Sequence, residues 1–325
     1  MSTTPLRPPL SPIARRVRAY FAPVDRNSSI PAIFDPALDA GFPLDAPPAP
    51  WLDVGWIENF RRSPGTEVLP VRAGAKGTTA SQFRARLEAR VEFDFLDWGK
   101  LQMALAGGSE HFNVLDPDPN APRTPSGAKG IPAVALQPGS TATEIIVGSG
   151  AVAAFAPGDV IVVDLDYVNQ TGYVGAAIAG AFVRNPADVS GDVDFIRRAS
   201  FNLGKVASTT ATSLLLVQPL LGGTPPVNAK VQKVIAFVDR EAGSFFQEWS
   251  ALFILPAESG GRVCFHYPFL QPAASARETS FTVAGPLESF ALHAAFTARP
   301  LGDPIDAERV LCYRTFYPPP AAPLY

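Results

Sequence analysis

The sequence predicts a mainly β protein: a β-sandwich or partial barrel with one short flanking helix, plus an inserted small all-β domain. Three observations favour this class. Apolar and charged residues alternate over residues 81–95, and 34 prolines and 26 glycines are spread along the chain without a period. Short apolar runs are separated by glycine-rich turns. This composition is typical of many short strands joined by loops and argues against a helical bundle.

Residues 1–49 are predicted to form a proline-rich N-terminal arm. Because proline fixes φ and removes a backbone donor, we expect neither a regular sheet nor a long helix here, although residues 13–20 could form two helical turns. Apolar residues such as Tyr20, Phe21 and Phe34 are too many for a free tail. The arm is therefore expected to lie along a surface, either its own or a neighbour's.

The first part of the main domain is predicted over residues 50–112, with short strands at 51–60 and 67–71. The alternation over 81–95 then predicts one long strand, because successive side chains of a strand point to opposite faces. Its apolar face begins at Phe83, and its charged face carries Arg84, Arg86, Glu88, Arg90, Glu92 and Asp94. Asp97 is expected to cap a short helix that ends at the Gly107–Gly108 pair.

A second proline-rich stretch, residues 113–139, is interpreted as a linker into an inserted all-β domain over residues 140–240. Strands are expected in this insert at 143–147, 159–167, 176–183, 213–217 and 230–238. The main domain then resumes over 241–318, with strands at 245–255, 262–267, 289–298 and 308–316, and a turn at Gly260–Gly261. A tail, 319–325, ends the chain. The two outer parts are expected to close one sheet system.

The sequence offers little for chemistry. Its three histidines and two cysteines lack metal-ligand spacing, and it has neither a nucleophile elbow nor a phosphate-binding loop. The net charge of −3 gives no sign of nucleic-acid affinity. We therefore predict no enzymatic activity, no metal and no cofactor. We also expect no membrane span, because no apolar run reaches 18 residues, and folding in a cytosol, because no signal peptide is recognised.

Two acidic pairs are the remaining candidates for a site. Asp164 and Asp166 share one face of a predicted strand, which we interpret as its wet face. Asp192 and Asp194 precede Arg197 and Arg198, so local ion pairing is expected there.

Residues 52–107 resemble the N-terminal half of phage tail tube proteins. The resemblance depends on the opening strand Val54–Glu58, the strand and loop Val68–Gly77, and the alternating run followed by a helix and a Gly-Gly pair. Residues 290–299, Asp303-Pro304 and 310–316 look like the closing strands of that family. The match is a pattern of elements and covers under half of the chain.

The resemblance implies two packed β-sheets with a flanking helix, and subunits that form rings, usually hexameric, whose inner strands join into one barrel. Stacked rings make a hollow tube through which DNA passes without specific binding. The partners would be further copies and other tail proteins such as the tape measure and the tail terminator. The location would be the virion tail, assembled in the host cytoplasm, with the insert on the outside.

On this resemblance Phe83 and the charged face would form the tube wall, and Arg72, Lys76 and Thr78 would belong to an inter-ring loop. A DNA conduit is expected to have an acidic lumen. The face has three arginines and three acids. Either other strands supply the negative wall, or this face is not luminal.

Three other interpretations stay open. The chain could be the inner tube of a contractile injection or secretion system, which shares the fold. It could be a β-rich carbohydrate-binding or hydrolytic protein that uses Asp164, Asp166 and the aromatic residues of the stretch 245–269. It could also be another virion β-protein, such as a capsid decoration or baseplate component.

Overall fold

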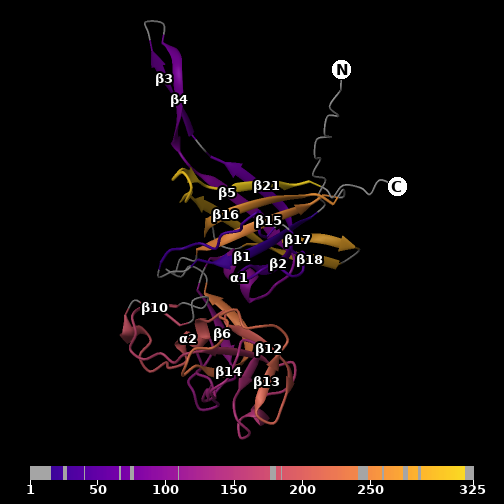
Figure 1. Ribbon diagram of the computed structural model, residues 1–325. Coiled ribbons are helices and arrows are strands. Elements are labelled where there is room, and N and C mark those ends of the chain that lie inside the picture. The colour runs from indigo at the N-terminus through magenta and orange to yellow at the C-terminus, as the bar shows by residue number, and fades with distance from the viewer. Residues whose placement is uncertain are drawn as a thin grey trace, which may run out of the picture. The chain divides into compact units, whose positions relative to one another are not determined.

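The computed structural model divides the chain into two compact units, each described here by itself (Figure 1). It describes residues 16–24, 28–39, 41–65, 67–73, 77–108, 110–175, 181–183, 185–240, 248–257, 260–273, 277–284 and 287–318. Unit 1 comprises Met1–Pro23, Pro31–Trp98 and Glu248–Tyr325, and unit 2 comprises Val24–Ile30 and Gly99–Gln247. Both are mainly β, as the sequence predicted, and among the described residues every helix lies in unit 2.

The inserted unit is larger than the predicted 140–240. It already includes the short helix and the proline-rich residues 113–139, which we interpreted as a linker. The backbone of that stretch is paired: the Ile131 N–H donates to Asp116 O at 2.9 Å, and the Asp116 N–H donates to Lys233 O at 2.9 Å. The prolines shape a loop that belongs to the unit rather than a connection between units.

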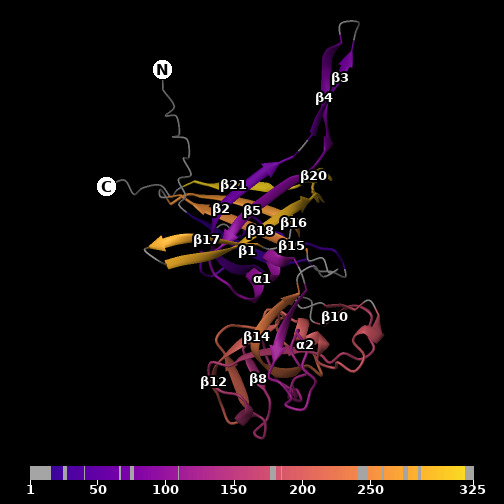
Figure 2. The ribbon, with the colours of Figure 1, turned by 180° about the vertical axis from the view of Figure 1, so that it is seen from behind.

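Eight strands of unit 1 pair in the order β17-β18-β5-β2-β1-β15-β16-β21 (Figure 2). Their bounds are β1 Val17–Pro23, β2 Leu52–Pro64, β5 Ala89–Phe95, β15 Trp249–Pro256, β16 Arg262–Pro272, β17 Arg277–Ala284, β18 Leu287–Arg299 and β21 Tyr313–Tyr317. β18 also pairs with β16, with Leu270 opposite Ala298. Six strands, β18, β5, β2, β1, β15 and β16, therefore form a closed circuit, to which β17 and β21 add at the sides.

Aromatic rings from four strands fill the inside of this circuit. Phe21 of β1, Phe93 of β5, Phe253 of β15 and Phe296 of β18 are all fully buried. Phe93 stacks on Phe296 with ring centroids 5.7 Å apart, and Phe21 meets Phe253 edge-on at 5.9 Å. Such pairs stabilise beyond the area that they bury. The apolar phase predicted for the second half of the alternating run thus faces the core.

The N-terminal segment contains a central strand, where the sequence predicted an arm without regular sheet. β1 is paired along both edges, with Arg18 opposite Trp56 on β2 and Ala19 opposite Phe253 on β15. The prediction was wrong because the prolines flank the strand instead of interrupting it: residues 13–22 are free of proline, and Pro23 comes at the strand's end. Residues 1–15 lie outside the described part of the chain.

Residues 31–39 and 41–51 cover the outer face of β1, β15 and β16. Phe34 and Trp51 pack there against Tyr20, Leu252, Ile254 and Cys264. The Tyr20 hydroxyl donates to Leu44 O at 2.5 Å, and Arg262 Nη1 donates to Phe42 O at 2.7 Å. This part of the predicted arm therefore lies on the protein's own surface.

His266 is buried beneath this covering segment. Its Nε2 lies 3.3 Å from Ala32 O, and its ring meets Trp51 edge-on at 5.6 Å. Burial lowers the pKa of His266 to about 4. In the unfolded chain the histidine has its ordinary pKa of about 6.5 and therefore binds a proton more tightly than in the fold. The contribution of the neutral ring to stability is thus fully present above pH 6.5 and is lost as the pH falls through 4.

We expect the free energy of unfolding of unit 1 to fall by about 2 kcal/mol between pH 7 and pH 4.5 through His266 alone. Urea unfolding of the wild type and of His266→Phe at both pH values isolates this contribution, because the other titrating groups are common to both chains. An equal pH dependence in the two proteins would contradict the assignment.

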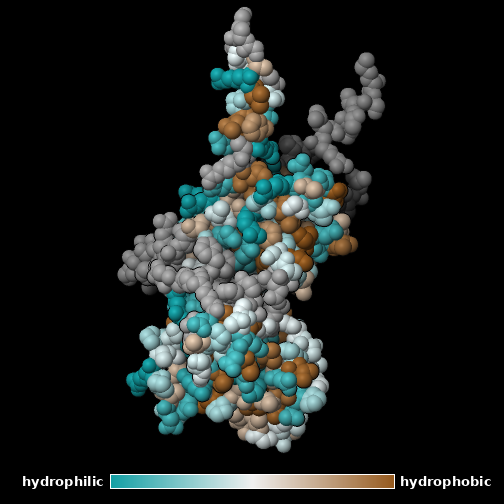
Figure 3. Space-filling view, turned by 90° about the vertical axis from the view of Figure 1, so that its left-hand side faces the viewer, coloured by the Kyte–Doolittle hydropathy of each residue, from teal (hydrophilic) through white to brown (hydrophobic). Residues whose placement is uncertain are grey.

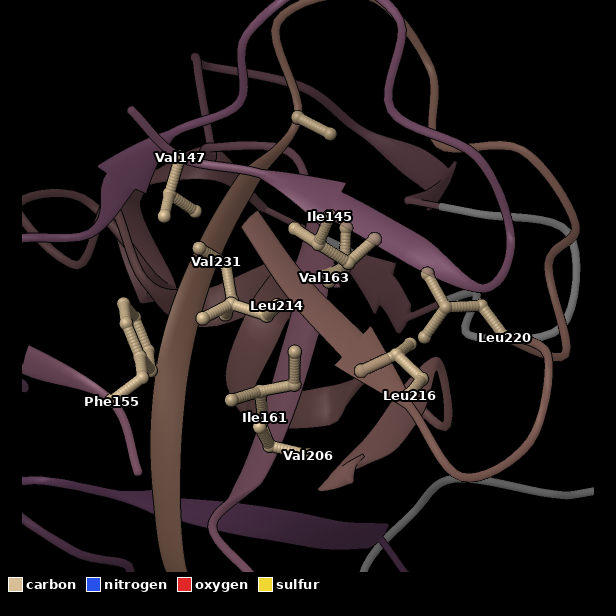
Figure 4. Packing of buried hydrophobic residues seen from close by; sticks show 11 residues of the cluster. Ile145, Val147, Phe155, Ile161, Val163, Val206, Leu214, Leu216, Leu220 and Val231 are labelled. Atoms are coloured by element: carbon tan, nitrogen blue, oxygen red, sulfur yellow. The ribbon is translucent and has the colours of Figure 1, made fainter. Parts of the chain in front are cut away.

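Unit 2 is built around a second sheet, in the order β6-β14-β9-β12-β13-β8 with β7 also paired to β14. The bounds are β6 Glu110–Leu115, β7 Val134–Ala135, β8 Glu144–Ile146, β9 Val160–Asp164, β12 Leu203–Thr209, β13 Ser213–Leu216 and β14 Lys230–Arg240. The residues after β7 connect the start of β14 with β8: the Leu136 N–H donates to Ala229 O at 3.1 Å and the Gln137 N–H to Ile146 O at 2.8 Å. Figure 4 shows the aliphatic core inside, with Ile145, Ile161, Val163, Leu214 and Val231 turned toward one another.

The predicted short helix is α1 (Lys100–Gly107), which packs against β14 and β6 of unit 2. Gly108 ends it with a φ of 57° and donates its N–H to Ala104 O at 3.0 Å, the expected glycine stop. Its N-cap residue is Gly99, without a side-chain cap, so Asp97 does not play the predicted role.

Lys100 anchors α1 inside unit 2. Its ammonium donates to Asn113 Oδ1 at 2.7 Å and to Ser200 O, and lies 4.5 Å from the ring centroid of Phe201. Burial lowers the pKa of Lys100 well below its usual value.

A second helix, α2 (Phe195–Ala199), was not predicted. Within the described residues, neither helix, at eight and five residues, is long enough to cross a bilayer.

Most predicted strands exist, and the differences are local. The strand expected at 308–316 is two, β20 (Arg309–Val310) and β21. Of the strand expected at 176–183, only β11 (Ala181–Val183) lies in the described residues; it pairs with β10 (Gly172–Val174). β12 was missed because its residues 207–209 are polar or small and partly exposed, which leaves a weak alternation.

Candidate self-association surface

The alternating run that dominates the sequence is two strands rather than one. β4 (Thr78–Arg86) and β5 are separated at Leu87 and Glu88. The chain changes partner at this point: β5 pairs with β2 and β18, whereas β4 pairs with β3 (Glu67–Ala73). The Gly65 N–H donates to Glu88 O at 2.8 Å and joins the two chain segments at the base of the hairpin. Alternation continues through the break because both halves are strands.

The β5 half cannot pair with another copy edge to edge. Phe95 lies opposite Ile57 on β2, and Phe93 lies opposite Ala294 on β18, so both edges of β5 are occupied within the subunit. Within the alternating run, β4 is the strand that has a partner on one edge only, because it pairs with β3 in a two-stranded sheet.

The charged face of β5 is largely neutralised inside the subunit. Arg90 Nε lies 2.6 Å from Glu92 Oε1. Asp94 is buried, accepts from Asn59 Nδ2 at 2.7 Å, and lies 2.8 Å from Nδ1 of His293. Glu88 is half-buried beside the break. Arg90 is exposed but paired with Glu92, so the β5 face carries little unpaired charge.

The β3–β4 hairpin projects from the body of unit 1, and every residue of β3 is solvent-exposed (Figures 1 and 2). Leu69 lies directly opposite Phe83, and Val71 opposite Ser81, so these four side chains share one face. Leu69, Val71 and Phe83 are 38%, 44% and 53% exposed. We call these three residues the apolar row. The hairpin, uppermost in Figure 3, carries hydrophobic and hydrophilic groups side by side.

The opposite face of the hairpin is mixed. Val68 lies opposite Arg84, and Pro70 opposite Gln82, all of them exposed. The flanking Arg72 is also exposed, and Thr78 is held by a hydrogen bond from its Oγ1 to Ala73 O at 3.2 Å. Lys76 and the side chain of Arg86 lie outside the described residues.

The two edges of the hairpin are chemically different. Proline has no N–H, so within a paired strand it fits where its nitrogen points away from the neighbouring strand. Pro70 therefore leaves the edge of β3 that faces away from β4 without one hydrogen-bond donor. The matching residue of β4, Gln82, keeps its donor, and β4 contains no proline. An exposed edge without proline is a template for a further strand, and in this hairpin that edge belongs to β4.

The acidic pairs that could have formed a catalytic or carbohydrate site are engaged within unit 2. Asp164 is fully buried and accepts from Ser200 Oγ at 2.8 Å, so it does not lie on the wet face where we expected it. Asp166 contacts Arg197 at 2.6 Å and Lys230 at 2.5 Å.

The ion pairing expected for the second acidic pair is confirmed, with Asp194–Arg197 and Asp192–Arg198 both at 2.8 Å. Among the described residues, no group of three histidine, cysteine or acidic side chains could hold a metal ion. Both cysteines are free; Cys264 is buried and Cys312 is half-buried.

Leu69, Val71 and Pro70 were not predicted to belong to a functional site. Their segment, Glu67–Ala73, is apolar on both faces, which is the usual signature of a buried strand, yet every residue of it is exposed. That mismatch between composition and exposure marks the hairpin as a candidate for self-association.

Comparison with protein-family models finds no match, and comparison with curated proteins finds no significant match.

Proposed function

We propose that this chain is a structural subunit of a phage tail tube, which self-assembles into stacked rings that form a hollow conduit for DNA delivery. Its role is structural rather than enzymatic, in the virion tail, and its partners are further copies together with other tail proteins such as the tape measure and the tail terminator. The resemblance of residues 52–107 and the closed strand circuit of unit 1 support the proposal.

One observation carries the proposal: an extended two-stranded hairpin whose apolar row is exposed, with no element in the described part of the subunit covering it. An isolated two-stranded hairpin is at best marginally stable in water, so this one needs a partner to hold a fixed shape. Fully burying one large apolar side chain contributes about 1.5–3 kcal/mol. Because Leu69, Val71 and Phe83 are each about half exposed, a neighbour covering them would contribute several kcal/mol.

The free edge of β4 gives the association a direction. In the proposed ring, a strand of the next copy adds to this edge, while Pro70 prevents addition at the β3 edge. Edge-to-edge addition that closes on itself also removes the aggregation hazard of an open edge.

The test is electron microscopy of the purified chain with two matched variants at Gln82. We expect rings or tubes about 100 Å wide for the wild type, the size of roughly six ordinary domains around a pore. Gln82→Pro removes the outward donor of β4, just as Pro70 does on β3, and should abolish assembly. Gln82→Ala keeps the donor and should assemble normally.

A wild-type chain that remains monomeric at high concentration would refute the tube. Assembly that is equal in Gln82→Pro and Gln82→Ala would refute the β4 edge as the site of addition.

A further inference from the structure

Arg62 of β2 reaches across the inside of the strand circuit to β16, with which β2 does not pair. It lies opposite Val91, a buried residue of the aromatic interior, and opposite residues of an antiparallel pair share a face. The Arg62 Nε donates to the Tyr267 hydroxyl at 2.5 Å, and the guanidinium lies 4.1 Å from the ring centroid of Phe265. Two aromatic residues of β16 therefore fix the position of this charge.

The charge held in this way has no counter-ion. Arg62 is half-buried, and within the described residues no carboxylate pairs with it. Arginine has five N–H donors, and the bond to Tyr267 uses the one on Nε. The two terminal amino groups form the edge that binds two oxygens of a carboxylate or a phosphate at once. The guanidinium is thus preorganised for an anion.

A second arginine lies beside the first. Arg314 of β21 is directly opposite Phe265 and is exposed, so its side chain leaves the same face as the ring that Arg62 covers. Burial raises the pKa of the Cys312 thiol, whereas the charges of Arg62 and Arg314 act against this rise, so both guanidinium groups lie near one sulfur. Among the residues that the structure describes, Arg314 also lacks a carboxylate partner. Two unpaired like charges repel each other, and an anion between them would remove that repulsion.

The surface next to the two arginines is aromatic. Phe316 lies two residues along β21 from Arg314 and opposite Val263 of β16, so it belongs to the same face. Its side chain is 59% exposed. An anionic ligand with an apolar or planar body would find a contact for that body here.

We propose that Arg62 and Arg314 form a binding site for a phosphate group. Their two positive charges match a phosphate monoester, which carries close to two negative charges at neutral pH, better than the single charge of a carboxylate. The phosphate would belong either to a small organic ligand or to the backbone of a nucleic acid. The site uses neither the apolar row nor the edge of β4, so it does not depend on the proposed assembly.

The first test is calorimetric titration of the full chain with inorganic phosphate, at an ionic strength held constant with chloride. We expect saturable binding in the millimolar range. Arg62→Gln and Arg314→Gln should each weaken it at least about 10-fold, because each removes charge-assisted hydrogen bonds to the ligand. Arg314 is exposed, so its variant keeps the test valid even if Arg62→Gln unfolds. Arg61→Gln removes the same charge from the opposite face of β2 and should bind like the wild type.

Cys312 supplies a second readout at the site itself. Phosphate bound to the two arginines would offset the charges that favour the thiolate, and the thiolate is the reactive form. Alkylation of Cys312 by iodoacetamide in the folded protein should therefore slow as phosphate saturates the site. Cys264 is 1% exposed and does not compete for the reagent.

Glycerol phosphate and a short DNA duplex, each added as a competitor of inorganic phosphate, distinguish a monoester ligand from a nucleic-acid backbone. Competition by neither would mean an adventitious ion only and would overturn the site. Equal phosphate binding by the Arg62, Arg314 and Arg61 variants, or an alkylation rate that phosphate does not change, would overturn it as well. None of these outcomes bears on the tube proposal, and a wild type that never assembles leaves this site in place.

Discussion

Replacing Leu69 and Phe83 together by aspartate is expected to abolish assembly. The two side chains lie opposite each other at the centre of the apolar row, and both are half exposed in the subunit. In an assembled state they would be covered, so the substitution removes about 3 kcal/mol of burial and adds two carboxylates that must be desolvated. We expect association to weaken by well over 100-fold. Sedimentation velocity across a concentration series measures this change.

The same double variant should leave the subunit folded. Because surface substitutions away from structural contacts usually change stability within about 0.5 kcal/mol, the near-ultraviolet spectrum and urea midpoint should match the wild type. Val217→Asp with Leu221→Asp is the matched control, since these exposed apolar residues of unit 2 are 57% and 42% exposed. Equal assembly of the hairpin variant and the control would mean that the apolar row is not an interface.

Much of the strand content could be predicted because alternation survives wherever one face is core. In β5, Val91, Phe93 and Phe95 face the aromatic interior and Glu92 faces outward. The period-two alternation alone predicts this arrangement. It does not predict which strand β5 pairs with. The break at Leu87 and Glu88 leaves the alternation intact, because β4 and β5 are both strands and differ only in what they pair with.

Composition was misleading where prolines border a strand. β1 is seven residues between proline-rich stretches, and the surrounding composition indicated an arm. Its central place in the sheet depends on β2 and β15, which are distant in sequence, and no local signal reports that pairing.

The candidate site was half predictable. Phe83 and Arg84 were found through alternation, whereas Leu69 was not. Counting outward from the Gly74–Gly77 turn pairs Leu69 with Gln82, but a bulge between Val71 and Arg72 moves its partner to Phe83. A one-residue shift changes which side chains share a face, so the apolar row emerges only when the register is known.

The largest stability effect is expected at Arg197 of unit 2. Its side chain is 1% exposed and is held by Asp166, Asp194 and Gln232, with its Nε donating to Gln232 Oε1 at 2.5 Å. Asp166 keeps Lys230 as a second partner, but Asp194 is itself only 3% exposed. Arg197→Met therefore leaves the Asp194 carboxylate buried without its counter-ion. Breaking a buried pair in this way costs about 3–5 kcal/mol.

Urea unfolding of the full chain, with hydrogen exchange to localise the loss to unit 2, measures this effect. Lys233→Met is the control, because the Lys233–Asp159 pair at 3.0 Å is more exposed and should cost less than about 1 kcal/mol. Adding Asp194→Asn to Arg197→Met removes the uncompensated charge and should recover part of the loss. If Asp194→Asn lowers the stability of Arg197→Met further, the unpaired charge of Asp194 is not the cause of the loss. Arg197 would then stabilise unit 2 through packing and its hydrogen bond to Gln232.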